Sequence, residues 1–242
     1  KQFKMFTATT FYRICIALVG AVSVRGDCFI KPDKDGSVVI PDGTETITPD
    51  AFRDCTALRK IVIPASVKTI GSAAFAYAVN LKKVFFHEGN NLKDIGNLAF
   101  GGCVSLEKFD FPNSLKKIEN FAFYGSGLKK ASFKSGIGVI GNYAFESCES
   151  LKKITFPPSL RRIGVRAFYG SGLEEVKFYI KKRESRLKRI GERAFYLSEN
   201  LKTINIPTGV EVIGMGAFVG TGCPNSQMFF PGATIVNCFV ME

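Results

Sequence analysis

Few residues in this chain could carry out catalysis, and each lacks the neighbours that a catalytic site needs. His87 is the single histidine, so a Ser-His-Asp or Cys-His site would have to use it, and no catalytic motif surrounds it. No C-x-x-C or H-x-x-x-H pair occurs, which disfavours a structural zinc. The carboxylate pair Glu174-Glu175 stands where matching segments have lysine pairs, which indicates surface positions. We therefore predict no enzymatic activity, no cofactor, no metal and no small-molecule substrate.

A glycine pattern typical of dinucleotide-binding sites also occurs. Residues 136–141 read Gly-Ile-Gly-Val-Ile-Gly and satisfy G-x-G-x-x-G, in which the glycines let a pyrophosphate approach a helix N-terminus and an acidic residue follows about 20 positions later. Here that later position falls among Leu160, Arg161 and Arg162. Gly141 also belongs to a phrase that recurs along the chain. We interpret the match as a by-product of that repetition.

The repeated phrase is Ile-Gly-x-x-Ala-Phe, seen at Ile140-Gly141…Ala144-Phe145. Counting from a degenerate first copy that ends in Phe52, the repeat phenylalanines are separated by 23, 25, 23, 22, 23, 27 and 23 residues. A fixed period in the twenties indicates a solenoid, in which each turn contacts only its neighbours.

Each regular unit begins with Leu-x-x-apolar-x-apolar, as in Leu58-Arg59-Lys60-Ile61-Val62-Ile63. Such alternation predicts a short strand with one buried side, and a proline such as Pro64 often ends it. The Ile-Gly corner follows, and then Ala-Phe, which we expect to form a short helical or turn segment whose Phe fills the interior. The units begin at Leu58, Leu81, Leu106, Leu128, Leu151, Leu173 and Leu201.

At this level of detail the chain resembles a known family. The phrase at 151–168, Leu-Lys-Lys-Ile-Thr-Phe-Pro…Leu-Arg-Arg-Ile-Gly…Ala-Phe, is similar to the BspA-type (Treponema-type) leucine-rich repeat, and the resemblance covers about residues 38–222. It implies a curved or flattened right-handed solenoid with a parallel sheet along a concave face. It also implies proteins that bind other proteins, matrix or host surfaces without shared catalytic residues. The predicted fold is a leucine-rich-repeat solenoid (α/β) of about eight turns of 22–28 residues, mostly short parallel strands with turns and short helical segments.

Four regions follow from this pattern. Residues 1–26 contain no acid and include an apolar run at 14–24, which suits either an export-type signal or an apolar docking segment. Residues 27–57 are predicted to form an N-terminal cap with the degenerate first repeat, 58–222 the repeats, and 223–242 a C-terminal cap.

The seven cysteines leave the compartment open. Cys55, Cys103 and Cys148 each lie three residues after a repeat Phe, in a slot that otherwise holds Ala, Ser or Thr. These cysteines are two turns apart, which is roughly 10 Å at strand spacing and too far for a disulfide. We expect them to be free, buried thiols. Only Cys15, Cys28, Cys223 and Cys238 remain as possible pairs.

Basic residues suggest where a partner would bind. The net charge of +12 favours anionic partners. Lysines recur just before the first inward residue of five successive strands, and they could form a basic ridge, although the alternative is that they only solvate the surface. The predicted binding residues of the concave face are Lys60, Lys83, Lys108, Lys130, Lys153, Phe85, Asp110, Thr155, Lys177 and Asn205, with Val62 and Ser132 between them.

Two further groups of basic residues could contribute to binding. The insertion loop after the strand at 173–178 contributes Lys181, Lys182, Arg183 and Arg186, because loops inserted on one edge of a solenoid frequently bind partners. A second basic column precedes the Ile-Gly corner: Lys68, Lys116, Lys117, Arg161, Arg162, Lys188 and Arg189. Nucleic acid is disfavoured, because exposed aromatic residues interleaved with the basic ones, which base stacking requires, are missing, and nearly every Phe belongs to a core column.

The functional hypothesis is a non-enzymatic module that binds an acidic protein partner on the concave face, as a secreted or cell-surface adhesin or receptor-like protein. The alternative is an accessory structural subunit of a larger organellar or membrane-associated assembly, docked through residues 1–26 and the basic faces.

Overall fold

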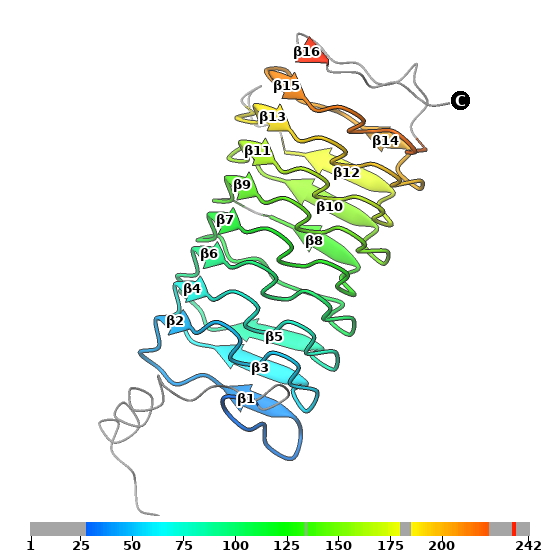
Figure 1. Cartoon of the computed structure of the whole chain (residues 1–242). Coiled ribbons are helices and arrows are strands. Elements are labelled where there is room, and N and C mark those ends of the chain that lie inside the picture. The colour runs from blue at the N-terminus through cyan, green and yellow to red at the C-terminus, as the bar shows by residue number, and fades with distance from the viewer. Residues whose placement is uncertain (1–27, 134, 180–184, 223–233, 236–242) are drawn as a thin grey trace, which may run out of the picture.

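The structure is a computed structural model that describes residues 28–133, 135–179, 185–222 and 234–235. It is a solenoid in which successive turns stack along one axis and every strand pairs in parallel with its neighbour one turn away (Figure 1). The leucine-rich-repeat solenoid predicted from the sequence is confirmed. Each turn has three sides, which we call the strand face, the corner and the turn-segment side.

The strand face is formed by the Leu-x-x-apolar-x-apolar units. Inward residues such as Ile61 and Ile63 are buried, while Lys60 is exposed, so the predicted alternation is confirmed. These strands form two separate sheets, β1-β3-β5 and β8-β10-β12-β14. The strands are β1 (Ser37–Val39), β3 (Lys60–Ile63), β5 (Lys83–Phe86), β8 (Lys130–Ser132), β10 (Lys153–Phe156), β12 (Glu175–Phe178) and β14 (Thr203–Ile204).

The corner strands form one continuous sheet of nine strands. Each is two residues long, and where the burial of its second residue is described, that isoleucine is buried. The strands are β2 (Thr46–Ile47), β4 (Thr69–Ile70), β6 (Asp94–Ile95), β7 (Lys117–Ile118), β9 (Val139–Ile140), β11 (Arg162–Ile163), β13 (Arg189–Ile190), β15 (Val212–Ile213) and β16 (Thr234–Ile235).

Glycine follows the corner isoleucine because successive turns come very close there. A Cβ atom on Gly164 would lie 2.5 Å from the carbonyl carbon and oxygen of Gly141 in the preceding turn. That separation is far inside van der Waals contact, so only the absence of a side chain permits this approach.

The turn-segment side carries the Ala-Phe phrase, and it is not helical. In each turn the residues two before and two after the Phe have positive φ, as at Tyr143 (59°) and Ser147 (57°) around Phe145. This backbone breaks the helical hydrogen-bond pattern. The prediction of short helical segments is therefore wrong, and turns take their place. Within the described residues no helix is long and apolar enough to span a bilayer.

Backbone hydrogen bonds join the turn segments in a constant pattern. Three amides of each turn donate to three carbonyls of the next turn, for example Tyr143 to Val165 (2.8 Å), Phe145 to Ala167 (2.8 Å) and Ser147 to Tyr169 (2.9 Å). The same pattern runs from the turn of Phe52 to that of Phe218, always with the earlier turn as donor. The backbone therefore links successive turns on this side in the same way whatever side chains they carry.

The repeat phenylalanines form the spine of the core. From Phe52 to Phe218 they stack with ring centroids 4.9–5.4 Å apart and interplanar angles of 3–9°. All eight are at most 3% exposed. The prediction that each turn contributes its Ala and Phe to a shared interior is confirmed.

The cysteine prediction is right for two residues and wrong for one. Cys103 and Cys148 are free and buried, but Cys55 forms a disulfide with Cys28, with their Cα atoms 5.2 Å apart. The prediction compared cysteines only within the repeat register. Cys28 lies before that register, where the amide of Phe29 donates to the carbonyl of Ala51 (2.8 Å), and this contact places it over the first turn. Cys15, Cys223 and Cys238 lie outside the described residues.

Candidate protein-binding surface

The strand face holds the predicted lysine column in two parts. Lys60 pairs in register with Lys83 in the first sheet. In the second part Lys108, Lys130 and Lys153 follow one another, and Glu175 continues the row. All five lysines are exposed. No strand pairing joins Lys83 to Lys108, so the expected continuous ridge is interrupted after two lysines.

Neighbouring groups neutralise part of the lysine charge. Lys108 lies 3.1 Å from Asp110, and Lys153 and Lys177 both contact Glu175, at 3.4 Å and 2.7 Å. The hydrogen bond from Lys177, helped by Lys153, lowers the pKa of the Glu175 carboxyl. Such exposed ion pairs contribute little to folding, because water and salt screen them. Among the described residues, no acidic group lies within ion-pair distance of Lys60, Lys83 or Lys130. Of the five lysines in the column, these three are therefore the ones without an ion pair.

The other predicted residues of this face lie between the lysines. Val62 and Phe85 are adjacent in the first sheet, and Ser132, Thr155 and Lys177 are adjacent in the second. Asp110 and Asn205 are exposed as well. The Phe85 ring is 44% exposed, and the ammonium of Lys60 lies over it, 5.1 Å from the centroid. The structure thus places the set on one side of the solenoid, in two blocks.

The insertion loop is described only in part. Lys181, Lys182 and Arg183 lie outside the described residues. Arg186 is exposed, and its amide donates to the carbonyl of Pro158 (3.1 Å). The assignment of this loop as a binding element stays a prediction.

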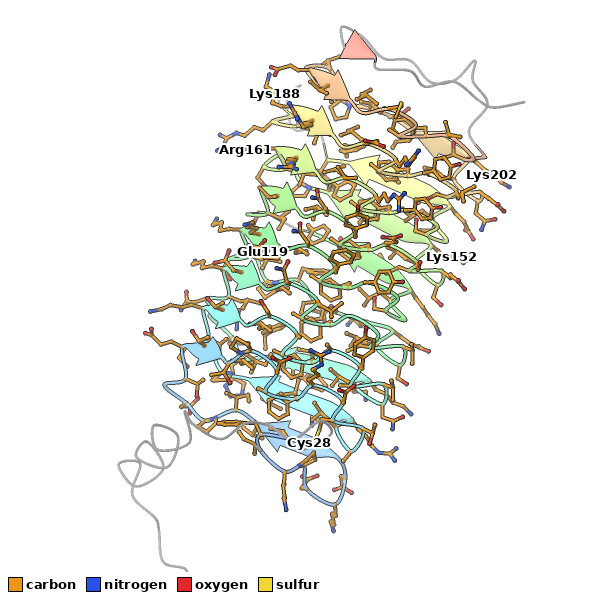
Figure 2. All side chains as sticks on the ribbon, in the orientation of Figure 1. Cys28, Glu119, Lys152, Arg161, Lys188 and Lys202 are labelled. Carbon is orange, nitrogen blue, oxygen red and sulfur yellow. A yellow bond between two sulfur atoms is a disulfide. The ribbon has the colours of Figure 1, made fainter. Side chains whose placement is uncertain are left out.

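The second basic column belongs to a different side. Figure 2 shows Arg161 and Lys188 beside the corner strands, at the opposite edge of the view from Lys152 and Lys202. Ion pairs bridge successive turns here, such as Lys188 with Glu211 (2.6 Å) and Lys68 with Glu45 (2.6 Å). A partner with one flat binding surface therefore cannot contact both basic columns at once.

Sequence reasoning missed a partly exposed row of aromatic and arginine side chains on the turn-segment side. Phe121 stacks on Tyr143 (4.6 Å between centroids), and Tyr169 on Tyr196 (5.2 Å). The Arg166 guanidinium lies 5.0 Å from the centre of the Tyr169 ring. We call Phe121, Tyr124, Tyr143, Arg166, Tyr169, Arg193 and Tyr196 the aromatic ladder. These residues stand two before or one after a repeat Phe, and that spacing was the available signal.

The aromatic ladder corrects one premise of the sequence reading. Phe121 and Tyr124 are both 37% exposed, so exposed aromatic residues are not missing from this chain. They lie on another side from the lysine column. The absence of exposed aromatic residues therefore no longer supports the expectation that nucleic acid does not bind. That expectation stays a prediction.

Groups that could react are held in unreactive settings. Burial raises the pKa of the Cys103 thiol to about 12 and that of Cys148 to about 11, although a hydrogen bond with Ser126 lowers the latter in part. Thiolate, the nucleophilic form, is therefore scarce near neutral pH. Partial burial also raises the pKa of the Glu146 carboxyl, against the lowering effect of Arg166. His87 is exposed on the loop after β5, and among the described residues no cluster of His, Cys, Asp and Glu could hold a metal ion.

Comparison with known proteins identifies the repeat. The model of the BspA type leucine rich repeat region matches in six copies, over residues 22–137, 86–184 and 179–236. A comparison with curated proteins finds no match.

Among solved structures, a leucine-rich repeat protein from Bacteroides ovatus is 29% identical with a TM-score of 0.68, over 78% of this chain and 52% of that protein. The T. pallidum leucine rich repeat protein is 26% identical with a TM-score of 0.58, over 81% of each chain. A leucine rich cell surface protein from Faecalibacterium prausnitzii, 22% identical, shares the fold with a TM-score of 0.61, over 86% of this chain and 70% of that one. The chain thus spans about half the length of the B. ovatus protein.

Leucine-rich repeats of this kind typically mediate protein interaction and generally have no enzymatic role. With matches that cover most of its length, this chain belongs to the BspA-type leucine-rich repeat family.

Proposed function

We propose that this chain is a binding module that captures an acidic protein partner on its strand face. The observation that carries the proposal is the set of three exposed lysines without an acidic neighbour, Lys60, Lys83 and Lys130, held on a rigid stacked frame. Free ammonium groups on such a surface speed the capture of an anionic partner and make binding sensitive to salt. Phe85 adds apolar contact area in the middle of the set.

We also propose that the chain works outside the cytosol, as an adhesin or receptor-like protein. The support is the Cys28–Cys55 disulfide, because structural disulfides persist mainly in secreted and cell-surface proteins. The buried thiols of Cys103 and Cys148 are compatible with that setting, since oxidation requires access.

The alternative, an accessory structural subunit of a larger assembly, is favoured by the aromatic ladder. Tyrosine and arginine are enriched in the energetic centres of protein interfaces, and on the turn-segment side they form a second surface for a permanent neighbour. Residues 1–26, which that hypothesis uses for docking, lie outside the described residues.

Charge reversal of the strand face tests the main proposal. The variant Lys60→Glu, Lys83→Glu, Lys130→Glu is compared with Lys116→Glu, Arg161→Glu, Arg162→Glu, which makes the same change in net charge on exposed corner residues. Purified wild type and both variants are immobilised, and the proteins that each captures at low and high salt are quantified by mass spectrometry. We expect partners that are released by salt, lost with the strand-face variant and kept by the corner variant. Equal capture by all three proteins would reject the strand face as the binding surface.

A further inference from the structure

The strand face is split at one place. The first sheet ends at β5, and the next sheet begins at β8. Residues 106–111 lie between them and contribute only the isolated bridge between Lys108 and Lys130. In Figure 1 the arrows of the strand face stop at β5 and resume at β8, while the corner strands β6 and β7 continue across the same turns. The split therefore belongs to the strand face alone.

A bulky residue in the core explains the split. Phe109 occupies the first inward position, which is Ile61, Val84, Ala131 and Ile154 in the neighbouring strands. Its ring packs edge-on against Phe86, Phe100 and Phe123, with centroids 5.1–5.5 Å away. An aromatic ring needs more room than Val or Ala, so it separates the backbone of its own segment from β5. The loop 87–91, inserted directly after β5, lengthens the same turn.

The split leaves a free strand edge. The amides of Lys83 and His87 donate to the carbonyls of Arg59 and Ile63, on the side of β3. Because alternate residues of a strand direct their backbone groups to opposite sides, the amides and carbonyls of Val84 and Phe86 face the split. No backbone hydrogen bond joins residues 82–86 to residues 107–111 in the part of the chain that the structure describes. Such an edge is a template for another strand.

Two adjoining hollows follow this edge, with volumes of about 710 Å³ and 610 Å³. Residues 82–85 and 84–87 line one wall, and residues 107–108 and 110–114 contribute to the other; Val84, Phe85 and Asp110 line both hollows. We call this continuous depression the β5 groove. It runs the length of a strand of about five residues, roughly 17 Å.

The charged groups of the groove that are not engaged in ion pairs are positive. Glu107 and Asp110 are bound by Lys129 (2.8 Å) and Lys108 (3.1 Å). Lys82 and Lys83, on the β5 wall, form no ion pair with an acidic side chain among the described residues, and both are exposed. Beside them lie the exposed rings and methyl groups of Phe85 and Val104. The groove thus combines backbone donors and acceptors, two free ammonium groups and an apolar surface.

We propose that the β5 groove binds an extended acidic peptide of a partner protein, which adds as a strand to the free edge of β5. Backbone amides and carbonyls spaced as in a strand fit a polypeptide main chain. Lys82 and Lys83 fit carboxylates on that peptide, and Phe85 fits an apolar side chain between them. This inference rests on the proposed function, because the groove is part of the strand face, and it names the form of the partner segment.

The test begins with a peptide library. Random nonapeptides displayed on phage are selected on the full chain, and the most enriched sequence is synthesised with a fluorescent label for anisotropy titration. The groove variant Lys82→Gln, Lys83→Gln is matched with Lys152→Gln, Lys153→Gln, which changes the corresponding residues of β10 and its approach, where the sheet is unbroken. A second peptide carries N-methyl groups on every backbone amide, which prevents strand pairing along both of its edges without changing its charge.

We expect the selected peptides to be acidic with alternating apolar residues. The groove variant should bind about tenfold more weakly, as the loss of two exposed ion pairs requires, the β10 variant should bind like wild type, and N-methylation should abolish binding. Three results would each overturn the proposal: no enrichment over an unrelated control protein, equal affinity for the two lysine variants, or unchanged affinity of the N-methylated peptide. If any of these occurs while the Lys60→Glu, Lys83→Glu, Lys130→Glu protein still loses its partner, the groove is rejected and the strand-face function stands.

Discussion

The turn-segment side and the strand face are built from the same turns but behave differently. On the turn-segment side the same three backbone hydrogen bonds occur at every junction from the turn of Phe52 to that of Phe218. On the strand face the ladder of bonds stops at β5 and restarts at β8. At one core position Phe109 stands where the neighbouring turns have a smaller residue, and this difference coincides with the interruption. The backbone pairing is constant on one side and interrupted on the other.

The difference indicates which side of the solenoid can vary in local structure while successive turns stay joined. Continuity of the turn-segment side and the corner sheet holds successive turns together, so the strand face is free to open. The stacked phenylalanines lie beneath the turn-segment side, since each belongs to a turn segment. Under the proposed function, stability and recognition belong to different sides of one turn, and substitutions on the two sides should change the free energy of unfolding by different amounts.

The largest expected effect comes from the phenylalanine spine. Phe145→Ala removes a fully buried ring that stacks on Phe123 and Phe168, both 5.2 Å away, and should lower the free energy of unfolding by about 3–5 kcal/mol. Phe85→Ala removes an exposed ring of the strand face and should change it by less than about 0.5 kcal/mol. Urea unfolding followed by circular dichroism measures both. Similar losses for the two variants would break the comparison.

A slightly smaller effect is expected at the N-terminal end. Replacing Cys28 and Cys55 together by alanine removes a cross-link between residues 27 positions apart, and the unfolded chain gains entropy worth about 3 kcal/mol. Thermal unfolding of wild type with and without reductant should show the same loss, while reductant should leave the alanine variant unchanged. A wild type insensitive to reductant would mean that the first turn is held by its stacking alone.

The corner glycines give a sharper version of the same comparison. In Gly164→Ala the added Cβ meets the backbone of Gly141 at 2.5 Å, whereas in Gly138→Ala its nearest neighbour, the carbonyl oxygen of Lys116, is 3.8 Å away. We expect the first variant to lose about 1–3 kcal/mol and the second less than about 0.5 kcal/mol. Chemical denaturation of the pair decides the matter: equal stabilities would show that the corner can separate without cost.

The repeat phrase was sufficient to predict the solenoid, its strands and its buried spine, because burial imposes the same residue type on every turn. The split of the strand face was not predictable from that pattern. Phe109 is apolar like Ile61 and Val84, so the alternation looks unbroken. Its larger volume and the inserted loop 87–91 are visible in the sequence, but neither by itself indicates that strand pairing stops there. The positive φ values on either side of each Phe leave only a weak signal in residue type, since glycine occupies some of these positions and residues such as Tyr143 and Ser147 occupy others.

Parts of the candidate site depended on information outside the repeat. Cys28 precedes the register, so its pairing with Cys55 could not be derived from spacing. The residues of the aromatic ladder are in register, but the expected helical segment gave no reason to place them on one surface. Lys60, Lys83 and Lys130 were correctly placed on one side, while their freedom from ion pairs required side-chain positions. The division into regions at 1–26, 27–57, 58–222 and 223–242, and the basic loop at Lys181, Lys182 and Arg183, remain predictions.

The last predicted effect appears only at alkaline pH and concerns the thiols beneath the turn-segment side. Cys103 and Cys148 donate from Sγ to the carbonyls of Phe75 and Phe123, both at 3.0 Å. Burial raises their pKa to about 12 and about 11 from an ordinary value of 9.0. Above pH 9 the unfolded chain loses these protons while the folded chain keeps them, so stability should fall as pH rises, by about 1.4 kcal/mol per pH unit for each thiol once past the unfolded pKa.

The strand face should show the opposite sign at the acid end. The Glu175 pKa is lowered by Lys177 and Lys153, so its small contribution is present above its unfolded pKa and disappears as pH falls through its folded value. Urea unfolding measured between pH 8 and about 9.5 covers the range in which thiols of the unfolded chain begin to ionise, and comparison with an alanine variant isolates the contribution of the two thiols. The variant Cys103→Ala, Cys148→Ala should lose most of the alkaline slope, and Lys153→Gln should leave it unchanged. An unaltered slope in the double alanine variant would show that water reaches these thiols, and hence that the turn-segment side opens more readily than its continuous hydrogen bonding implies.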